Sequence, residues 1–379
     1  MRVLFLTPSL PWPLDAGGRI RTWQLLREIQ SRHEVHIYCV RQDGAGAEAE
    51  SRVADVCADL HVFERSPMPV PRYWLAPAPE SWFHSAAFEE ALAPAYKSGD
   101  YDLVHIDELL LIRPLCELSG PPEILHHHKL DVELCRGLHL AGRASLVETM
   151  RWRGLEELAA ARFCEHIFCS DHDATEFRER HPGAATHIVP NGVDLEYFKP
   201  RDEPRDRNEL LVLGSLDYEP NLQGLEVFLD SVWPKIQGRR PELSLVVVGA
   251  RAASGFLSRP PAGVHLVGEV PDVRPYLARA GALLVPLDIG GGSRLKIAEA
   301  LAMGCPVIST EIGAQGLKGD FGPLLARASS ITDLAELLLD WTRPPSQGAR
   351  AASVTNLAWS HAADELHAAW TAVATPPQA

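Results

Sequence analysis

Residues 285–310 read VPLDIGGGSRLKIAEALAMGCPVIST: an apolar run, a triple-glycine loop, a helical stretch and a Gly-x-Pro turn into a second apolar run. Glycines directly before a helix expose backbone N–H groups at the positive end of the helix dipole, and this arrangement favours an anion. Arg294 and Lys296 stand in the first turn, where a cation opposes the dipole unless an anion pairs with it. Glu299 follows on the same helix, and a carboxylate there can accept two hydrogen bonds from a ribose diol. The stretch therefore predicts a nucleotide site. The alternative, a solvated helix start, leaves the three glycines unexplained.

Apolar runs and helical stretches alternate in the same way along the rest of the chain. Short β-rich runs separated by longer amphipathic stretches, such as 19–31, 83–97 and 146–163, are typical of a parallel sheet with crossover helices. The sequence therefore predicts an α/β fold. The thirteen expected strands are residues 3–7, 34–39, 60–63, 103–106, 123–126, 166–169, 187–189, 209–213, 243–248, 264–267, 282–285, 306–309 and 323–326.

A charged, proline-containing segment separates the two series of strands. Residues 199–208, KPRDEPRDRN, have the composition of an exposed linker. With 379 residues the chain is too long for one ordinary core. We expect an N-terminal domain over residues 1–198 and a C-terminal, nucleotide-binding domain over residues 199–356. A terminal helix within residues 357–379 is expected to pack back on the first domain.

Composition excludes several classes of protein. The net charge of −14 argues against nucleic acid as a main partner, because phosphate backbones demand a basic surface. No apolar run approaches the roughly 20 residues that span a bilayer. The seven cysteines are scattered without a CxxC pair, which indicates reduced thiols in the cytoplasm and neither a disulfide framework nor a zinc site.

Two further segments carry polar or glycine patterns. Residues 7–21, TPSLPWPLDAGGRIR, end a strand and open a helix at Gly17 and Gly18, which would let an anion approach the backbone. A plain helix cap is the alternative. Residues 126–131, HHHKLD, follow another strand. Neighbouring side chains of an extended segment point to opposite faces, so three adjacent histidines cannot converge on one metal ion.

A likeness to a known family emerges from the strings HIVPNGVDLEYF (residues 187–198) and 285–310. Both resemble family 4 of the retaining GT-B glycosyltransferases, and the likeness extends over nearly the whole chain. The N-terminal segment resembles the exopolysaccharide-type subgroup of that family. The resemblance implies two facing Rossmann-like parallel-sheet domains with an interdomain cleft, an acceptor-binding N-terminal domain and a donor-binding C-terminal domain.

The sequence departs from the family pattern at the phosphate site. Glu299 matches the second of two glutamates that the family carries here, and by resemblance it holds the ribose, whereas the first falls on Gly291. An Arg and a Lys that contact the diphosphate in the family are replaced by Ser215 and Gln223. We hypothesise that Arg294 and Lys296 take over the phosphate role.

The resemblance also implies which residues bind each substrate. On the acceptor side, His128 is the best match to a family histidine that faces the sugar, and a general base for the acceptor hydroxyl would come from its neighbours. A mere polar loop is the alternative. The other acceptor-side candidates are Arg19, His105, Asp107, Glu108, His126, His127 and Asp131. The catalytic candidates are His128, Arg294, Lys296 and Glu299. The donor-binding candidates are Gly17, Gly18, Gly214, Ser215, Gly249, Glu269, Val270, Tyr276, Gly290, Gly291, Gly292, Ser293 and Leu295.

The expected activity is transfer of a sugar, with retention, from a nucleoside-diphosphate sugar such as a UDP-sugar to a hydroxyl of a glycan, lipid-linked or natural-product acceptor. We expect no metal and no cofactor. Two alternatives remain: a nucleotide-sugar epimerase or sugar-phosphate synthase on the same fold, and a non-catalytic GT-B module that binds a nucleotide sugar or a protein. Prolines and aromatics in residues 66–82, with six arginines in the first 41 residues, are compatible with weak peripheral contact at the inner face of the membrane.

Overall fold

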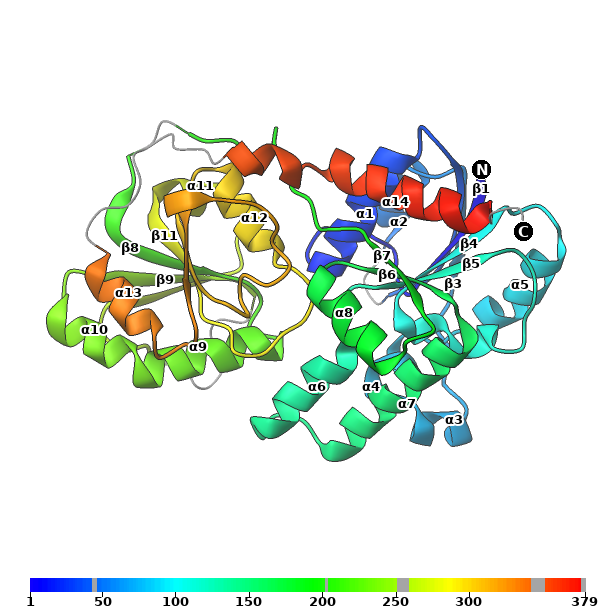
Figure 1. Cartoon of the computed structure of the whole chain (residues 1–379), viewed down its shortest axis with the longest axis horizontal. Helices are drawn as coiled ribbons and strands as arrows, with labels where there is room; N and C mark the ends of the chain where they lie inside the picture. The colour runs from blue at the N-terminus through cyan, green and yellow to red at the C-terminus, as the bar shows by residue number, and fades with distance from the viewer. Residues whose placement is uncertain (43–45, 202–203, 251–258, 342–351, 376–379) are drawn as a thin grey trace. The chain divides into compact units, whose positions relative to one another are not determined.

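The structure, a computed structural model, describes residues 1–42, 46–201, 204–250, 259–341 and 352–375. The chain forms two α/β units (Figure 1). Unit 1 comprises Met1–Asn191 and Trp359–Ala379, and unit 2 comprises Gly192–Ala358. The expected α/β fold class is confirmed, and each of the thirteen expected strands overlaps a strand of the structure.

The sheet of unit 1 has seven parallel strands in the order β3-β2-β1-β4-β5-β6-β7. Its central strands are nearly continuous apolar runs because both of their faces are covered. In β1, for example, Val3, Leu4, Phe5 and Leu6 are at most 2% exposed. The strands are β1 (Arg2–Thr7), β2 (Glu34–Val40), β3 (Asp59–Phe63), β4 (Leu103–Asp107), β5 (Glu123–His127), β6 (Glu165–Phe168) and β7 (Ala185–Ile188).

Helices connect these strands, and one arrives from the far end of the chain. Helix α14 (Trp359–Ala374) packs against α1, and Arg32, just beyond the end of α1, pairs with Asp364 of α14 at 2.6 Å. The other helices of unit 1 are α1 (Gly17–Ile29), α2 (Ala47–Ala54), α3 (Val70–Leu75), α4 (Ala78–Trp82), α5 (Ala86–Lys97), the short η1 (Leu109–Leu111) and η2 (Arg113–Leu115), α6 (Asp131–Leu140), α7 (Leu146–Arg162) and α8 (Asp171–Arg180).

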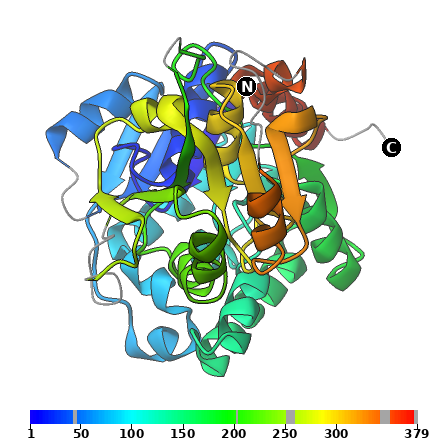
Figure 2. The ribbon, with the colours of Figure 1, turned by 90° about the vertical axis from the view of Figure 1, so that its left-hand side faces the viewer.

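The sheet of unit 2 has six parallel strands in the order β10-β9-β8-β11-β12-β13 (Figure 2). Along β8, Leu211 and Leu213 join one apolar cluster while Leu210 and Val212 join another, so the sheet lies between two apolar layers. The strands are β8 (Asp206–Leu213), β9 (Ser244–Val248), β10 (Val264–Gly268), β11 (Ala280–Val285), β12 (Val307–Thr310) and β13 (Leu325–Ala328). The helices are α9 (Glu219–Ser231), α10 (Trp233–Arg239), α11 (Arg274–Arg279), α12 (Leu295–Ala302), η4 (Gly322–Leu324), α13 (Leu334–Asp340) and η5 (Ala352–Leu357).

Each sheet reverses its strand order once. The reversal lies between β1 and β4 in unit 1 and between β8 and β11 in unit 2. Loops that leave the carboxyl ends of such neighbouring strands diverge, and ligands of open α/β sheets bind in the crevice that results. These two places are therefore where functional side chains are expected.

The segment expected to be a linker contributes to unit 2. Strand β8 begins inside it, at Asp206. Arg205 donates to the carbonyl oxygens of Leu277 at 2.6 Å, Ala280 at 3.0 Å and Met303 at 2.9 Å, so its guanidinium joins the carboxyl ends of α11 and α12. Of the helices in the described part of the chain, none combines the length and apolar character that a membrane span requires. All seven cysteines are free, and four of them are buried.

Candidate active site

The predicted nucleotide site lies at the strand reversal of unit 2. Gly214 follows β8, and residues 286–294 connect β11 to α12. Because β8 and β11 are neighbours, the sequence stretches 214–224 and 285–310 meet at one edge of the sheet. Lys296, shortly after the loop glycines at 290, 291 and 292, thus contacts Asn221, which lies 75 residues earlier in the chain.

Lys296 reaches from α12 across this edge. Its Nζ donates to the carbonyl oxygen of Leu213 and to Oδ1 of Asn221 at 3.0 Å. Gly214 has a φ of +137°, and a Cβ there would lie 2.8 Å from the Lys296 Nζ and 2.7 Å from the Asn221 Nδ2. Glycine is therefore required by both the backbone conformation and the space that the lysine fills.

Two ionisable groups on α12 have shifted pKa values. Burial, and then the nearby charge of Arg294, lowers the pKa of Lys296 from its usual 10.5 to about 7, with Glu299 opposing the shift. Burial raises the pKa of Glu299 from 4.5 to about 7, with Lys296 opposing the shift. An anion bound beside Lys296 would favour the charged ammonium and raise its pKa again. The site therefore gains positive charge when a phosphate arrives.

Arg294 occupies the N-cap position of α12 and has no carboxylate partner among the described residues. Its Nη1 donates to the carbonyl oxygen of Gly291, while Nε and Nη2 are buried and have no hydrogen-bond partner among the described residues. A Cβ at Gly290 would collide with the Nη2 atom. Leaving donors of a guanidinium buried and unpaired is costly, so a bound acceptor is the natural partner for these atoms.

The other donor-side candidates lie in two groups. Gly249 follows β9 beside Gly214, and its N–H donates to the carbonyl of Gly268 at 2.8 Å. Ser215 accepts from the backbone N–H of Asp217 at 3.2 Å in a tight turn. Glu269 is exposed, Val270 and Tyr276 are half-buried against the apolar core, Ser293 is half-buried, and Leu295 begins α12. Gly17 and Gly18 belong to unit 1, where they begin α1.

Asn221 was not identified from the sequence. It holds the Lys296 ammonium through Oδ1, and its Nδ2 donates to the carbonyl oxygen of Ser215 at 2.9 Å. An asparagine in the first turn of the helix that follows a glycine loop was the signal available, because it can bond the loop backbone and a side chain at the same time.

Asp107 is the centre of the cluster at the strand reversal of unit 1. It ends β4 and is 1% exposed. Its Oδ1 lies 2.8 Å from the His128 Nε2 and 3.3 Å from the His126 Nδ1. Its Oδ2 accepts from the hydroxyls of Thr22 at 2.7 Å and Thr7 at 3.2 Å. Burial alone would raise the pKa of Asp107, but the charge of His128 and the histidine hydrogen bonds hold it well below its usual value.

His128 lies between two carboxylates. Its Nδ1 is 2.9 Å from the Glu108 Oε1, opposite the contact with Asp107. Burial by itself would lower the pKa of His128, but Glu108 and Asp107 raise it well above its usual value, so the ring is an imidazolium. Glu108 has a φ of 99°, an unusual backbone conformation for a residue with a side chain. A Cβ at Gly18 would lie 3.3 Å from the His128 Nδ1, which places the start of α1 against this ion pair.

Three ligand-type atoms of this cluster, from His105, Asp107 and His126, lie within 4.8 Å of one another. Trp370 donates to Nδ1 of His105 at 2.9 Å, so the proton of that neutral ring is on Nε2. Arg21 donates to Nε2 of His126 at 2.8 Å, so the proton of that ring is on Nδ1. In these tautomers the ring nitrogens that face Asp107 carry protons and have no lone pair to offer. A hydrogen-bond network accounts for the cluster.

Arg21 is a second residue that sequence reasoning missed. Its guanidinium is buried in unit 1 and also donates to the carbonyl oxygens of Val189 at 2.6 Å and Pro190 at 3.0 Å, and to Oδ1 of Asn191 at 2.7 Å. It therefore fixes the Pro-Asn-Gly turn to α1 and to the histidine cluster. A buried arginine on a helix leaves no periodic signal that distinguishes it from its half-buried neighbour Arg19.

The remaining acceptor-side candidates lie outside the cluster. Arg19 pairs with Asp15 at 2.8 Å near the surface. His127 points to the other face of β5, as the alternation of a strand requires; there its Nε2 lies 3.0 Å from the His166 Nδ1 and its ring stacks on Phe168. Asp131 begins α6 and pairs with Lys129 at 3.0 Å.

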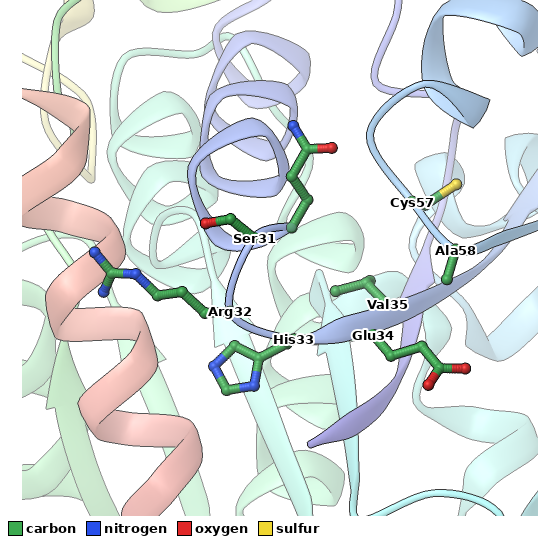
Figure 3. A pocket seen from close by; sticks show the side chains of 8 residues that line it. Ser31, Arg32, His33, Glu34, Val35, Cys57 and Ala58 are labelled. Carbon is green, nitrogen blue, oxygen red and sulfur yellow. The ribbon is translucent and has the colours of Figure 1, made fainter.

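A separate hollow of about 440 Å³ lies at the other end of the unit 1 sheet, lined by residues 30–35, Cys57 and Ala58 (Figure 3). It adjoins the amino end of β2, away from the carboxyl ends where ligands of parallel sheets bind. His33 there contacts His367 at 2.8 Å, and burial, with the positive charge of the chain's amino terminus next, lowers the pKa of His33 to about 4. We do not assign this hollow to the site.

Comparisons with known proteins cover both units. The family model described as "Glycosyltransferase Family 4" matches residues 16–197, and that described as "Glycosyl transferases group 1" matches residues 207–343. The MMP alpha-(1->4)-mannosyltransferase of Mycolicibacterium hassiacum is 25% identical over 339 residues, which cover 79% of this chain and 78% of that protein.

Solved structures share the fold over nearly the full length. Anabaena Alr3699/HepE in complex with UDP and glucose has a TM-score of 0.68 at 14% identity, covering 98% of this chain and 100% of that one. Sucrose-phosphate synthase (tll1590) from Thermosynechococcus elongatus has a TM-score of 0.72 at 18% identity, covering 98% of both chains. With two family models on its two units and the sheet order of each unit described above, the chain belongs to glycosyltransferase family 4 and has the GT-B fold.

Proposed function

We propose that this glycosyltransferase uses a nucleoside-diphosphate sugar as donor and transfers the sugar to a hydroxyl with retention of configuration, without a metal ion. The observation that carries the proposal is the pair of cations at the strand reversal of unit 2. Among the described residues, neither Arg294 nor Lys296 forms an ion pair with a carboxylate. Two such cations at the start of a helix that follows a glycine loop need an anion.

The diphosphate would lie against the loop glycines, with Arg294 as a forked donor and Lys296 as a point charge. Glu299, one turn further along α12, would accept the ribose hydroxyls. As the bond from the sugar to the diphosphate breaks, the charge that develops on the leaving oxygen would fall on these two cations and the helix start. This supply of positive charge takes the place of a metal ion in the proposal.

UDP is the nucleotide to test first. The Alr3699/HepE structures are in complex with UDP, with UDP and glucose, and with UDP-glucose. The mannosyltransferase relative supports a hexose as the transferred group. We propose a glycan, lipid-linked or small-molecule hydroxyl as the acceptor class, held from unit 1.

Retention is proposed to follow from attack on the same face that the diphosphate leaves. In this step the bond between the anomeric carbon and the phosphate oxygen breaks, the bond to the acceptor oxygen forms, and the acceptor proton passes to the leaving phosphate. The cluster of unit 1 offers little alternative to the phosphate as the group that takes this proton. Both oxygens of Asp107 already accept hydrogen bonds, and both nitrogens of His128 face carboxylates. His128 is therefore proposed to hold positive charge beside Gly18 and not to act as a general base.

The donor site is tested by calorimetric titration with UDP and with uridine. The Arg294→Ala/Lys296→Ala variant should bind UDP about 100-fold or more weakly, because two charge-assisted hydrogen bonds are lost, while uridine binding stays unchanged. Lys235→Ala removes an exposed lysine of α10 and serves as the matched control. Unchanged UDP affinity in the double variant would reject the site, and thermal-shift comparison of UDP, GDP, dTDP and ADP would identify the base.

Product analysis tests the activity. Incubation with UDP-glucose and a mixture of hydroxyl acceptors should release UDP and form a glycoside that keeps the anomeric configuration of the donor. An isomeric sugar nucleotide would instead indicate an epimerase, and UDP-glucose binding with no release of UDP would indicate a binding module.

A further inference from the structure

Trp370 of α14 reaches the histidine cluster of unit 1 from the far end of the chain. Helix α14 packs against α1, β4 and β5, and Figure 1 shows it beside them. The side chain of Trp370 is fully buried, and its indole N–H donates to Nδ1 of His105 at 2.9 Å. The indole and the imidazole also meet edge to face, with ring centroids 5.5 Å apart. Trp370 therefore fixes the place of the His105 ring and occupies one of its two nitrogens.

This hydrogen bond decides which nitrogen of His105 carries the proton. Burial lowers the pKa of His105, so the ring is neutral and has one donor and one acceptor nitrogen. An indole N–H can only donate, and Nδ1 is therefore the acceptor and Nε2 the donor. The ring is fully buried and stacks on Phe5 with ring centroids 4.4 Å apart, so it has no room to turn over and exchange its two nitrogens.

The position of this proton affects the donors that Asp107 receives. The His126 Nδ1 lies 3.3 Å from the Asp107 Oδ1 and also 3.3 Å from the His105 Nε2. While His105 carries its proton on Nε2, that nitrogen cannot accept, and the His126 N–H is left to the carboxylate alone. With the proton on Nδ1 instead, Nε2 would offer a lone pair and would compete with Asp107 for the same N–H. Trp370 therefore keeps His126 as a donor to Asp107.

Asp107 in turn sets the place of the His128 ring. Its Oδ1 contacts the His128 Nε2 at 2.8 Å as well as the His126 Nδ1, and a Cβ at Gly18 would lie 3.3 Å from the His128 Nδ1. A buried carboxylate that loses one donor moves toward its remaining donors, because an unmet buried acceptor is costly. A different proton position on His105 would therefore displace His128 at the start of α1.

We propose that Trp370 is a positioning residue for sugar transfer, and that its N–H acts by fixing the proton of His105 on Nε2. The inference rests on the proposed function, in which His128 holds positive charge at the start of α1. The effect passes along the hydrogen bonds of the cluster to His128, so Trp370 itself needs no contact with a substrate. Helix α14 then contributes to activity through one hydrogen bond and not only through packing.

Nitrogen NMR of the full-length protein, labelled at its histidines, tests the tautomer. In the wild type, Nε2 of His105 should be protonated and Nδ1 bare, and the loss of these signals in His105→Gln identifies them. Trp370→Phe keeps an aromatic ring but removes the N–H, so it should shift His105 toward the form protonated on Nδ1 and displace the ring signals of His128. The matched control is Trp233→Phe, which removes an indole N–H that donates to the carbonyl oxygen of Ala262 in unit 2 and should leave both rings unchanged.

A kinetic comparison tests the consequence for activity. With UDP-glucose as donor and 4-nitrophenyl glycosides as acceptors, Trp370→Phe should lower the acceptor kcat/KM about tenfold, as expected for the loss of one hydrogen bond. The UDP affinity measured by calorimetry should stay unchanged. In His105→Gln the amide has no tautomer to select, so adding Trp370→Phe should change kcat/KM less than about twofold. A tryptophan that acted only by packing would lower the rate equally in both backgrounds.

Three outcomes would overturn the role of Trp370. The first is a wild type whose His105 carries its proton on Nδ1, a result that needs no variant. The second is an unchanged His105 tautomer or an unchanged kcat/KM in Trp370→Phe, with circular dichroism confirming that the variant is folded. The third is an equal loss of activity in the wild-type and His105→Gln backgrounds. A wild type that binds no UDP would instead reject the proposed donor site, and the NMR comparison decides the tautomer independently of that result.

Discussion

The ammonium of Lys296 donates to Oδ1 of Asn221 across 3.0 Å and so joins α12 to α9 at the end of β8. The contact holds the lysine where Gly214 leaves room for it and where burial lowers its pKa to about 7. The side chain of Lys296 is therefore held in place even without a ligand, when only part of the population is protonated near pH 7. Several outcomes are expected from this arrangement.

Asn221→Asp should weaken UDP binding about tenfold. A carboxylate at this position would pair with Lys296 and compete with the diphosphate for it, since an opposite charge within hydrogen-bond reach favours the charged ammonium. Calorimetric titration gives the affinity. Asn208→Asp makes the same change at an exposed position of β8 and should leave the affinity unaltered. Equal UDP affinities for Asn221→Asp and the wild type would contradict this role of the Lys296–Asn221 contact.

UDP binding should take up about one proton near pH 8, because the diphosphate raises the pKa of Lys296 from about 7. Titrations in two buffers with different ionisation enthalpies measure the uptake. The Lys296→Met variant should show none from this group, and an uptake that persists in that variant would assign the proton elsewhere.

The stability of the ligand-free protein should depend on pH in the direction set by the lowered pKa of Lys296. Its folded pKa, about 7, is below its unfolded value near 10.5, so between these pH values the unfolded chain binds the extra proton. The free energy of unfolding of the wild type, relative to Lys296→Met, should therefore increase as the pH rises from about 7 to about 10. Urea unfolding at both ends of this range measures the difference, and a difference independent of pH would show that Lys296 is not desolvated.

His128→Gln should destabilise unit 1 by about 3 kcal/mol near pH 6, because it leaves two carboxylates without their shared cation. The pKa of His128 is raised by folding, so the stability it contributes is full below the unfolded pKa near 6.5 and is lost as the pH rises toward the folded value. The difference between wild type and variant should therefore shrink at high pH. Urea unfolding measures it, with the exposed His361→Gln of α14 as control. A constant difference from pH 6 to 9 would contradict the imidazolium.

The strands could be predicted because parallel strands that are covered on both faces appear in the sequence as uninterrupted apolar runs, such as residues 3–6. The glycine loop with Arg294 and Lys296 was equally visible, since its local pattern opposes the helix dipole. The roles of Arg21 and Asn221, and the hydrogen bond of Trp370 to His105, were not predicted. Each acts through a partner that is distant in the sequence, and helical spacing does not show which polar side chain turns inward. The start of β8 within the expected linker was missed because charged residues begin that strand beyond the edge of the apolar core.

The place of helix α14 at the end of the chain affects the order in which the two units can fold. Its Trp370 is 0% exposed and supplies the hydrogen bond that fixes the ring of His105, yet it lies beyond the whole of unit 2 in the chain. Domains generally fold as units while the ribosome is still translating. Unit 2, being continuous, can finish first, whereas unit 1 must wait with an unfilled tryptophan cavity and an incomplete histidine cluster until translation reaches α14. Nascent chains halted before α14 would therefore leave that cavity unfilled and its apolar lining exposed.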